Sequence, residues 1–210
     1  MDDRGHRCFA MCYDAITRVA ERRWLGAVRQ ELVGDLSGRV LEIGAGSGAN
    51  LAHYRAAGQV VAAEPDAAMR RRLRARPAGT AVPVRVLAAR GERLPFADAS
   101  FDAVVATLVL CSVDDPGRTL AEVRRVLKPA GRFVFFEHVR GTGTRGRIQD
   151  LLTPLWRRLG AGCHLNRRSL ATIEHAGLTV HDVRTFAPRP NLPVTVPMIR
   201  GVATRASPPR

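Results

Sequence analysis

The amino-acid sequence predicts an α/β fold: a doubly wound, seven-stranded sheet, mostly parallel with an antiparallel last strand, that carries helices on both faces. Three observations lead to this prediction. Short apolar segments alternate with helical segments, and the short segments are apolar on both sides, as strands covered by helices must be. The 210 residues are enough for one large hydrophobic core. We therefore expect a single domain over residues 1–210.

The chain begins with residues that favour helix. Apolar side chains from Phe9 to Leu32 recur at helical spacing, so residues 1–36 are expected to form N-terminal helices. Residues 39–43 then form a short apolar strand that runs into a glycine-rich segment, and a helix is expected over 49–56. This order of elements is the start of a parallel α/β sheet.

The next elements alternate in the same way. Residues 60–63 and 84–87 are short apolar segments and are expected to be strands, with a helix over 66–76 between them that a proline ends. Residues 101–106 form the fourth expected strand, and a helix over 116–127 follows it. An aspartate before that helix is a suitable N-cap.

The pattern changes after the fifth expected strand. A long helix with a break at Pro154 and a shorter helix follow that strand, and two strands then come without a helix between them. Such a succession favours an antiparallel pair at the end of the sheet. The expected bounds are strand 132–137, helices 145–159 and 169–176, and strands 179–186 and 194–203.

The net charge of +14 does not by itself indicate a nucleic-acid partner. Lys128 is the only lysine, and an excess of arginine with abundant alanine, glycine and proline is typical of a GC-rich coding sequence. Residues 131–210 are more basic than the rest, which could attract an anionic substrate, a membrane surface or RNA. Aromatic residues make up only 5% and are dispersed, so nucleic acid is not the expected partner.

Hydropathy and cysteine spacing indicate the compartment. No run of about 18 apolar residues occurs, so no transmembrane segment is expected, although a peripheral membrane contact stays open. The polar N-terminus does not resemble a signal peptide. Cysteines 8, 12, 111 and 163 have no CxxC spacing, which argues against a zinc site and against disulfides. The sequence therefore predicts a cytoplasmic protein with no metal.

The most informative segment follows the first expected strand, where Gly44, Gly46 and Gly48 alternate with small residues. A strand that runs into such glycines predicts a loop whose backbone a ligand can approach directly. Glu64 stands at the end of the next expected strand. Ligands of open α/β sheets lie beyond the carboxyl ends of the strands, so Glu64 is placed to bind the hydroxyls of a ribose.

The ligand expected at this loop carries positive charge. The third glycine comes one residue too early for the GxGxxG fingerprint of dinucleotide-binding proteins, and no lysine follows as a P-loop requires. Glu42, just before the loop, would repel a pyrophosphate. Its carboxylate suits the sulfonium and amino groups of S-adenosylmethionine. A methyl donor is thus favoured over a dinucleotide.

Further motifs follow in order along the chain: residues 40–51, 64–66, 92–96, 100–102 and 126–131. Together they resemble the successive motifs of class I S-adenosylmethionine-dependent methyltransferases, in particular the ubiquinone/menaquinone methyltransferase-like branch. A closer resemblance is to the small methyltransferase-like proteins that include alkyl thiol S-methyltransferases. The segments that carry this closer resemblance are 107–113, 137–139, 154–156 and 162–165.

The resemblance implies a Rossmann-like fold with S-adenosylmethionine as cofactor and S-adenosylhomocysteine as product. It divides the domain into a helical lid over 1–36, a cofactor-binding core over 37–138 and an acceptor-side region over 139–210. The family has an acidic residue near position 90 for the adenine amino group, where this chain has Arg90. Cofactor-binding roles are implied for Glu42, Gly44, Ala45, Gly46, Gly48, Glu64, Pro65, Gly91, Glu92 and Thr107.

Few side chains could act on the methyl acceptor. His138, after the fifth expected strand, is a candidate general base, or else hydrogen-bonds the loop and shapes the pocket. Tyr13 could cap the cofactor pocket or pack in the core. Trp156 and His164 are expected to line the acceptor pocket. Cys111 and Cys163 are expected to be small buried thiols, because direct methyl transfer needs no protein nucleophile.

The expected function is methyl transfer to a small molecule, with a thiol as the preferred acceptor. A thiol is partly ionised at neutral pH, so it depends less on a general base than an alcohol does. O-, N- or C-methylation of a lipid, quinone or natural product is the main alternative. RNA methylation and a non-catalytic cofactor-binding subunit also stay open.

Overall fold

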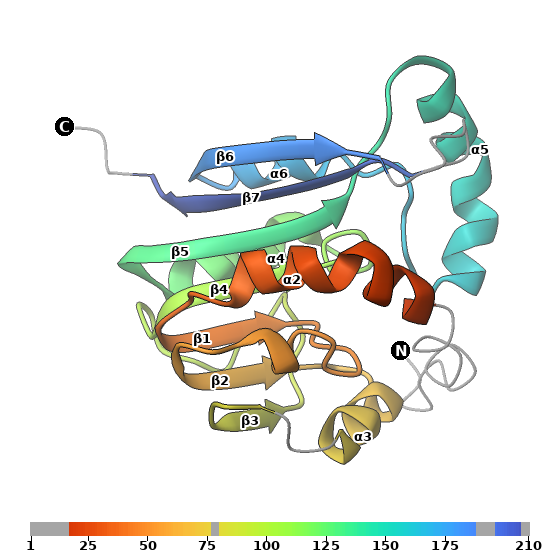
Figure 1. Cartoon of the computed structure of the whole chain (residues 1–210). Helices are drawn as coiled ribbons and strands as arrows, with labels where there is room; N and C mark the ends of the chain where they lie inside the picture. The colour runs from red at the N-terminus through yellow and green to blue at the C-terminus, as the bar shows by residue number, and fades with distance from the viewer. Residues whose placement is uncertain (1–16, 77–79, 188–195, 207–210) are drawn as a thin grey trace.

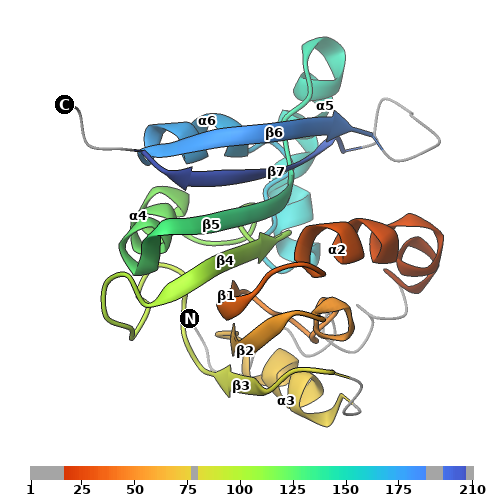
Figure 2. The same cartoon turned by 60° about the vertical axis from the view of Figure 1, so that its left-hand side comes forward.

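The computed structural model describes residues 17–76, 80–187 and 196–206, and shows one sheet with helices on both faces (Figures 1 and 2). The strand order is β3-β2-β1-β4-β5-β7-β6. Strands β1 to β5 run parallel, whereas β7 is antiparallel to β5 and to β6. The predicted fold class is confirmed. The strands are β1 (Gly38–Ile43), β2 (Ala57–Ala63), β3 (Val84–Leu87), β4 (Phe101–Thr107), β5 (Leu127–His138), β6 (Leu178–Phe186) and β7 (Met198–Arg205).

Helices cover both faces because successive strand residues are apolar on both sides. On one face, α2 (Gly26–Val33) and α3 (Ala67–Ala75) pack against side chains such as Val40 and Val60. On the other face, α4 (Pro116–Val126) and α6 (Ser169–His175) pack against side chains such as Leu41 and Phe133. Each expected strand and three of these helices are found within a few residues of their predicted bounds.

The helix expected over 49–56 is not formed. The chain makes only turns and a short 3-10 helix, η2 (Leu51–His53). The side chain of Asn50, just before η2, is buried and bonds to other parts of the site. Tertiary contacts of this kind override a weak helical pattern.

The break expected at Pro154 is also absent, because α5 (Gly143–Leu159) runs through this proline. Pro154 lies on the exposed side of α5, where water can satisfy the carbonyl that loses its helical donor. Figure 1 shows α5 beyond the end of the sheet toward which β1 and β2 point.

The N-terminal helical region is described from residue 17. Residues 17–20 are helical, a π-helical turn η1 (Glu21–Leu25) follows, and α2 continues to Val33. Leu25 packs against Phe136 and Met198, so this region lies on a face of the sheet. Its lid role stays a prediction. Tyr13, Cys8 and Cys12 lie outside the described residues.

In the part of the chain that the structure describes, no helix has both the length and the apolar character needed to cross a membrane.

Candidate active site

The glycine loop after β1 is closed at two glycines and open at the third. Gly44, Gly46 and Gly48 have φ angles of +59°, +57° and +84°, a region that favours glycine. A Cβ at Gly44 would lie 2.7 Å from Cγ2 of Val109, and one at Gly48 would lie 2.6 Å from Cδ1 of Leu73. Among the residues that the structure describes, the nearest neighbour of a Cβ at Gly46 would lie 4.0 Å away. A ligand can therefore lie against the backbone of Gly46.

Glu64, at the end of β2, lies beside the open glycine. Its Oε2 accepts a hydrogen bond of 2.8 Å from the backbone N–H of Gly46, and its Oε1 accepts one of 2.8 Å from Asp66. Burial raises the pKa of this carboxyl, and the two backbone bonds partly oppose the rise. Glu64 therefore shapes the loop as well as placing an acid there. Its contact with ribose stays a prediction.

Glu42, the second acid of the loop, is only 2% exposed. It accepts hydrogen bonds from the hydroxyl of Tyr54 at 2.9 Å and from Nδ2 of Asn50 at 3.0 Å. Burial raises the pKa of Glu42 to about 7, although the Tyr54 bond and the charge of Arg29 lower it in part. A bound cation would favour the ionised carboxylate.

A buried polar network connects Glu42 with α2. Nδ2 of Asn50 donates to Oγ1 of Thr107 at 3.0 Å, and Oδ1 of Asn50 accepts from Arg29 at 2.7 Å. Arg29 also bonds to Thr107 at 3.4 Å and pairs with Glu21 at 2.9 Å. The predicted Thr107 is thus part of the site. The network holds the end of β1, the end of β4 and α2 in one arrangement.

Arg29, Asn50 and Tyr54 were missed by the sequence interpretation. One signal could have found Arg29: it stands within the apolar stripe of its helix, four residues after Leu25 and four before Val33. A charged residue in such a stripe must find buried partners. Asn50 and Tyr54 carry no comparable signal, because only the turns after β1 bring their side chains back to Glu42.

The other predicted cofactor residues have structural partners. A Cβ at Gly91 would lie 2.8 Å from Cγ2 of Thr119, so this glycine allows close packing. Oε1 of Glu92 accepts from the backbone N–H of Asp114 at 2.9 Å. Glu92 thus fastens the turn before α4. Its adenine contact stays a prediction, as do contacts from Ala45 and Pro65.

Glu137, next to the end of β5, organises the loop after β4. It is fully buried, and its Oε1 accepts from the backbone N–H groups of Val109 and Leu110, each at 2.9 Å. Burial raises the pKa of this carboxyl to about 8, against the effect of these bonds. Leu108, before the anchored residues, has a φ of +59°. Glu137 therefore fixes a strained segment beside the glycine loop.

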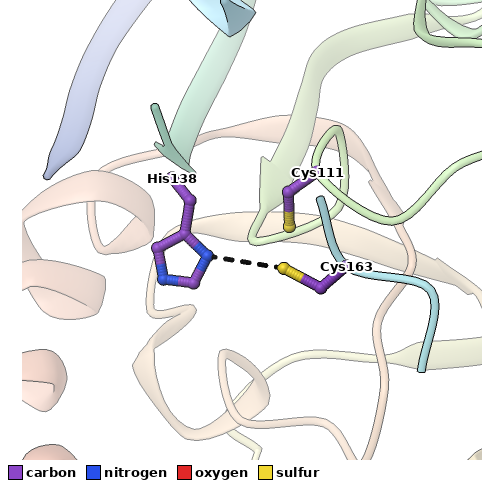
Figure 3. A group of neighbouring side chains, drawn as sticks. All are labelled: Cys111, His138 and Cys163. Atoms are coloured by element: carbon purple, nitrogen blue, oxygen red, sulfur yellow. Dashed lines mark hydrogen bonds between the residues drawn. The ribbon is translucent and has the colours of Figure 1, made fainter. Parts of the chain in front are cut away.

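His138, the last residue of β5, meets two thiols (Figure 3). Its Nδ1 lies 3.9 Å from Sγ of Cys163, and Cys111 completes the group. Cys111 and Cys163 are free and buried, as the sequence interpretation expects. The neighbouring thiol of Cys111 and the imidazole of His138 lower the pKa of Cys163 below its usual value, against the effect of burial.

The two predicted acceptor-pocket residues lie near this group. The backbone N–H of His164 donates to the carbonyl of Cys111 at 2.7 Å, and its Nδ1 lies 3.2 Å from the same oxygen. Trp156, on α5, is 45% exposed, and its indole helps to lower the pKa of Cys163, so it lies beside that thiol. His138, Trp156 and His164 therefore do gather at one end of the sheet.

The residues present fit S-adenosylmethionine. The open backbone at Gly46 leaves room for a ligand, and the two buried carboxyls that face this loop, Glu42 and Glu64, favour a cation over a phosphate. Thr107 is followed by Leu108, so the polar network around Glu42 is continuous in the chain with the segment that Glu137 anchors.

Known proteins resemble this chain in both sequence and fold. A methyltransferase domain family matches residues 41–135. Thiol S-methyltransferase TMT1B of Homo sapiens is 37% identical over 177 residues, which cover 80% of this chain and 72% of the relative. The TMT1B of Rattus norvegicus is 40% identical over 142 residues, 65% of this chain and 58% of the relative. Demethylmenaquinone methyltransferase of Renibacterium salmoninarum is 38% identical over 127 residues, 59% of this chain and 51% of the relative.

Among solved structures, the YcgJ protein of Bacillus subtilis has the same fold, with a TM-score of 0.70 and 18% identity; the match covers 88% of this chain and 98% of that one. The strand order, glycine loop and paired acids define a class I methyltransferase, a class whose cofactor is S-adenosylmethionine. The chain belongs to the methyltransferase family that includes these thiol S-methyltransferases. The matched region spans little more than half the length of the rat protein.

Proposed function

We propose that this protein transfers a methyl group from S-adenosylmethionine to the sulfur of a small apolar thiol in the cytoplasm. The observation that carries the proposal is the identity with thiol S-methyltransferases, which extends from the cofactor core into the region of Trp156 and Cys163. The free thiols of Cys111 and Cys163 are consistent with a reducing compartment.

The cofactor supplies an electrophilic methyl group on a sulfonium. Gly46 and Glu64 would hold its ribose, and Glu42 would face its cationic end. The network of Arg29, Asn50 and Thr107 keeps Glu42 in place without a ligand, so little reorganisation is needed when the cofactor binds. Such positioning is the main contribution that an enzyme makes to an in-line displacement.

The acceptor would bind between His138 and α5. Beside Trp156, α5 exposes Leu155 and Leu159, which offer apolar contacts to a hydrocarbon group. A thiol acceptor suits this position, since its ionisation does not depend on a strong general base. His138 is the base candidate for any acceptor that does need one.

A matched acceptor panel tests the proposal. The protein is incubated with methyl-labelled cofactor and with benzyl mercaptan, benzyl alcohol, benzylamine, a demethylmenaquinone analogue or RNA. We expect the thiol to receive label at least ten times faster than any other acceptor. Gly46→Val, which fills the open space at the loop, is the control that should transfer no label. Faster labelling of the quinone analogue would favour quinone methylation, which the bacterial relative's name indicates.

A further inference from the structure

Three potential metal ligands meet at the acceptor end of the sheet. Cys111 belongs to the loop after β4, His138 ends β5, and Cys163 belongs to the loop after α5. Figure 3 shows their side chains converging from these three segments. The two Sγ atoms and a ring nitrogen of His138 all lie within 4.8 Å of one another.

This geometry is close to that of a tetrahedral metal centre. Zinc binds sulfur at about 2.3 Å and imidazole nitrogen at about 2.0–2.1 Å, which places neighbouring ligand atoms roughly 3.5–3.8 Å apart. Nδ1 of His138 and Sγ of Cys163 are already 3.9 Å apart. A metal would therefore need only a small contraction of the group. Two thiolates and one imidazole are a ligand set of zinc sites that keep an open fourth position.

The backbone around the three ligands is firmly held. The carbonyl of Cys111 accepts from the backbone N–H of His164 at 2.7 Å, and the N–H of Cys163 donates to Gly160 at 3.0 Å. The carbonyl of His138 accepts from Ser169 at 3.2 Å. Supported ligands of this kind bind a metal with less reorganisation than ligands on free loops.

The charges near the group suit a dication. Two thiolates neutralise a divalent ion. The nearby ionisable groups include the buried Glu137, which accepts from the N–H of Cys111 at 3.4 Å, and Arg167, which donates to the carbonyls of Leu110 and Val113. The ring of His164 also lies nearby, with its Nδ1 3.2 Å from the carbonyl of Cys111.

We propose that Cys111, His138 and Cys163 bind one thiophilic dication, with zinc as the fitting ion, and that its fourth position takes the sulfur of the acceptor thiol. The role in catalysis rests on the proposed function, whereas binding of the metal does not. The glycine loop reaches this region, since a Cβ at Gly44 would lie 2.7 Å from Val109, two residues before Cys111. The loop after β4 thus contacts the glycine loop and also carries Cys111.

The chemistry balances without a redox step. When the acceptor's sulfur binds the metal, its S–H proton is released to solvent and the sulfur stays a thiolate. This sulfur forms the new S–CH₃ bond while the methyl–sulfonium bond breaks, and that electron pair stays on the departing thioether sulfur. The methylated product is a thioether, a weaker ligand than a thiolate, and leaves the metal. The metal keeps its oxidation state throughout.

Cobalt(II) is the probe for the site. Protein purified under reducing conditions is stripped with a chelator and titrated anaerobically with Co²⁺, without cofactor or acceptor. We expect one Co²⁺ per chain, with an intense thiolate-to-cobalt charge-transfer band and the strong visible bands of tetrahedral coordination. Zn²⁺ should displace the Co²⁺ and remove both. Cys163→Ser and His138→Ala should each weaken binding by about a hundredfold or more. His181→Ala, an exposed histidine on β6, is the matched control and should bind like the wild type.

Two results would overturn the site. The first is wild-type protein that binds no Co²⁺ or gives no thiolate band. The second is a Cys111→Ser/Cys163→Ser double variant that binds Co²⁺ like the wild type while its circular dichroism shows it folded. The role of the metal in catalysis is tested separately. Removal of zinc should abolish S-methylation but leave cofactor affinity unchanged. Turnover of thiols by metal-free protein would exclude the role, and methylation of another acceptor class would refute the proposed function while the binding result stands.

Discussion

The guanidinium of Arg29, on a helix that packs against the face of the sheet, donates a 2.7 Å hydrogen bond to Oδ1 of Asn50, whose own Nδ2 donates to Glu42. This contact connects the N-terminal helical region with Glu42, beside the glycine loop. A cation at Arg29 also favours the ionised form of Glu42, which in turn favours a cationic ligand.

Arg29→Met should weaken binding of S-adenosylmethionine by roughly tenfold. The change removes hydrogen bonds from a charged donor, each worth about 1.5–3 kcal/mol, and leaves Asn50 without a partner for Oδ1. Titration calorimetry measures the effect. Arg22→Met, an exposed neighbour on the same helical region, is the control and should leave affinity unchanged. Equal affinities for both variants would show that α2 has no part in the site.

Glu42 should make stability depend on pH. Its pKa is about 7 in the folded protein and near 4.5 when unfolded, so the folded state binds the proton more tightly. The stabilisation from this proton is complete below pH 4.5 and is lost as the pH rises through 7. Between pH 5.5 and 8.5, the wild type should lose about 2 kcal/mol of unfolding free energy relative to Glu42→Gln. Urea unfolding at both pH values checks this, and a constant difference would contradict it.

Substitution by alanine should affect stability differently at Gly44 and at Gly46, two glycines of the same loop. Gly44→Ala and Gly46→Ala each force a side chain into a left-handed conformation, at about 1–2 kcal/mol. Only Gly44→Ala also meets Val109, which adds roughly 1–3 kcal/mol. Urea unfolding should therefore find Gly44→Ala the less stable variant. Gly46→Ala should keep more stability but lose cofactor affinity by about tenfold or more, since its methyl group enters the open space. Equal stabilities would refute this account of the loop.

Glu64→Ala should lower cofactor affinity by about 1.5–3 kcal/mol, the range for a lost hydrogen bond to a charged group. Titration calorimetry with S-adenosylmethionine measures the loss. Glu174→Ala, an exposed acid on α6, is the control for removal of a carboxylate. Unchanged affinity in a folded Glu64→Ala protein would show that Glu64 does not contact the cofactor and only shapes the loop through its bonds with Gly46 and Asp66.

The strands could be predicted because a sheet that is covered on both faces needs apolar side chains on both faces. Val60 and Val104 are examples of such buried side chains. The glycine loop and its two acids were also predicted, because each is recognised by the expected strand next to it in the sequence. The helix expected after Gly48 was wrong because Asn50 makes long-range bonds there. The break expected at Pro154 was wrong because this proline lies on an exposed helix face.

Contacts between distant segments could not be predicted. Cys111, His138 and Cys163 have no spacing that resembles a metal motif, and only the order of the strands brings them together. The same holds for Arg29 and Asn50, which are 21 residues apart. A single sequence shows local patterns, whereas such clusters depend on the tertiary arrangement.

The position of β7 has a consequence for the order of assembly. Strands β1 to β5 pair with strands made before or soon after them, but β6 has to wait for β7, which separates it from β5. Met198 of β7 pairs with His138, so the end of the sheet at His138 is completed by a strand that leaves the ribosome well after β5. Closing so long a loop is slow and leaves the edge of β5 open to other chains in the meantime. During synthesis, strands β1 to β5 and the glycine loop can thus assemble before β6 and β7 complete the sheet.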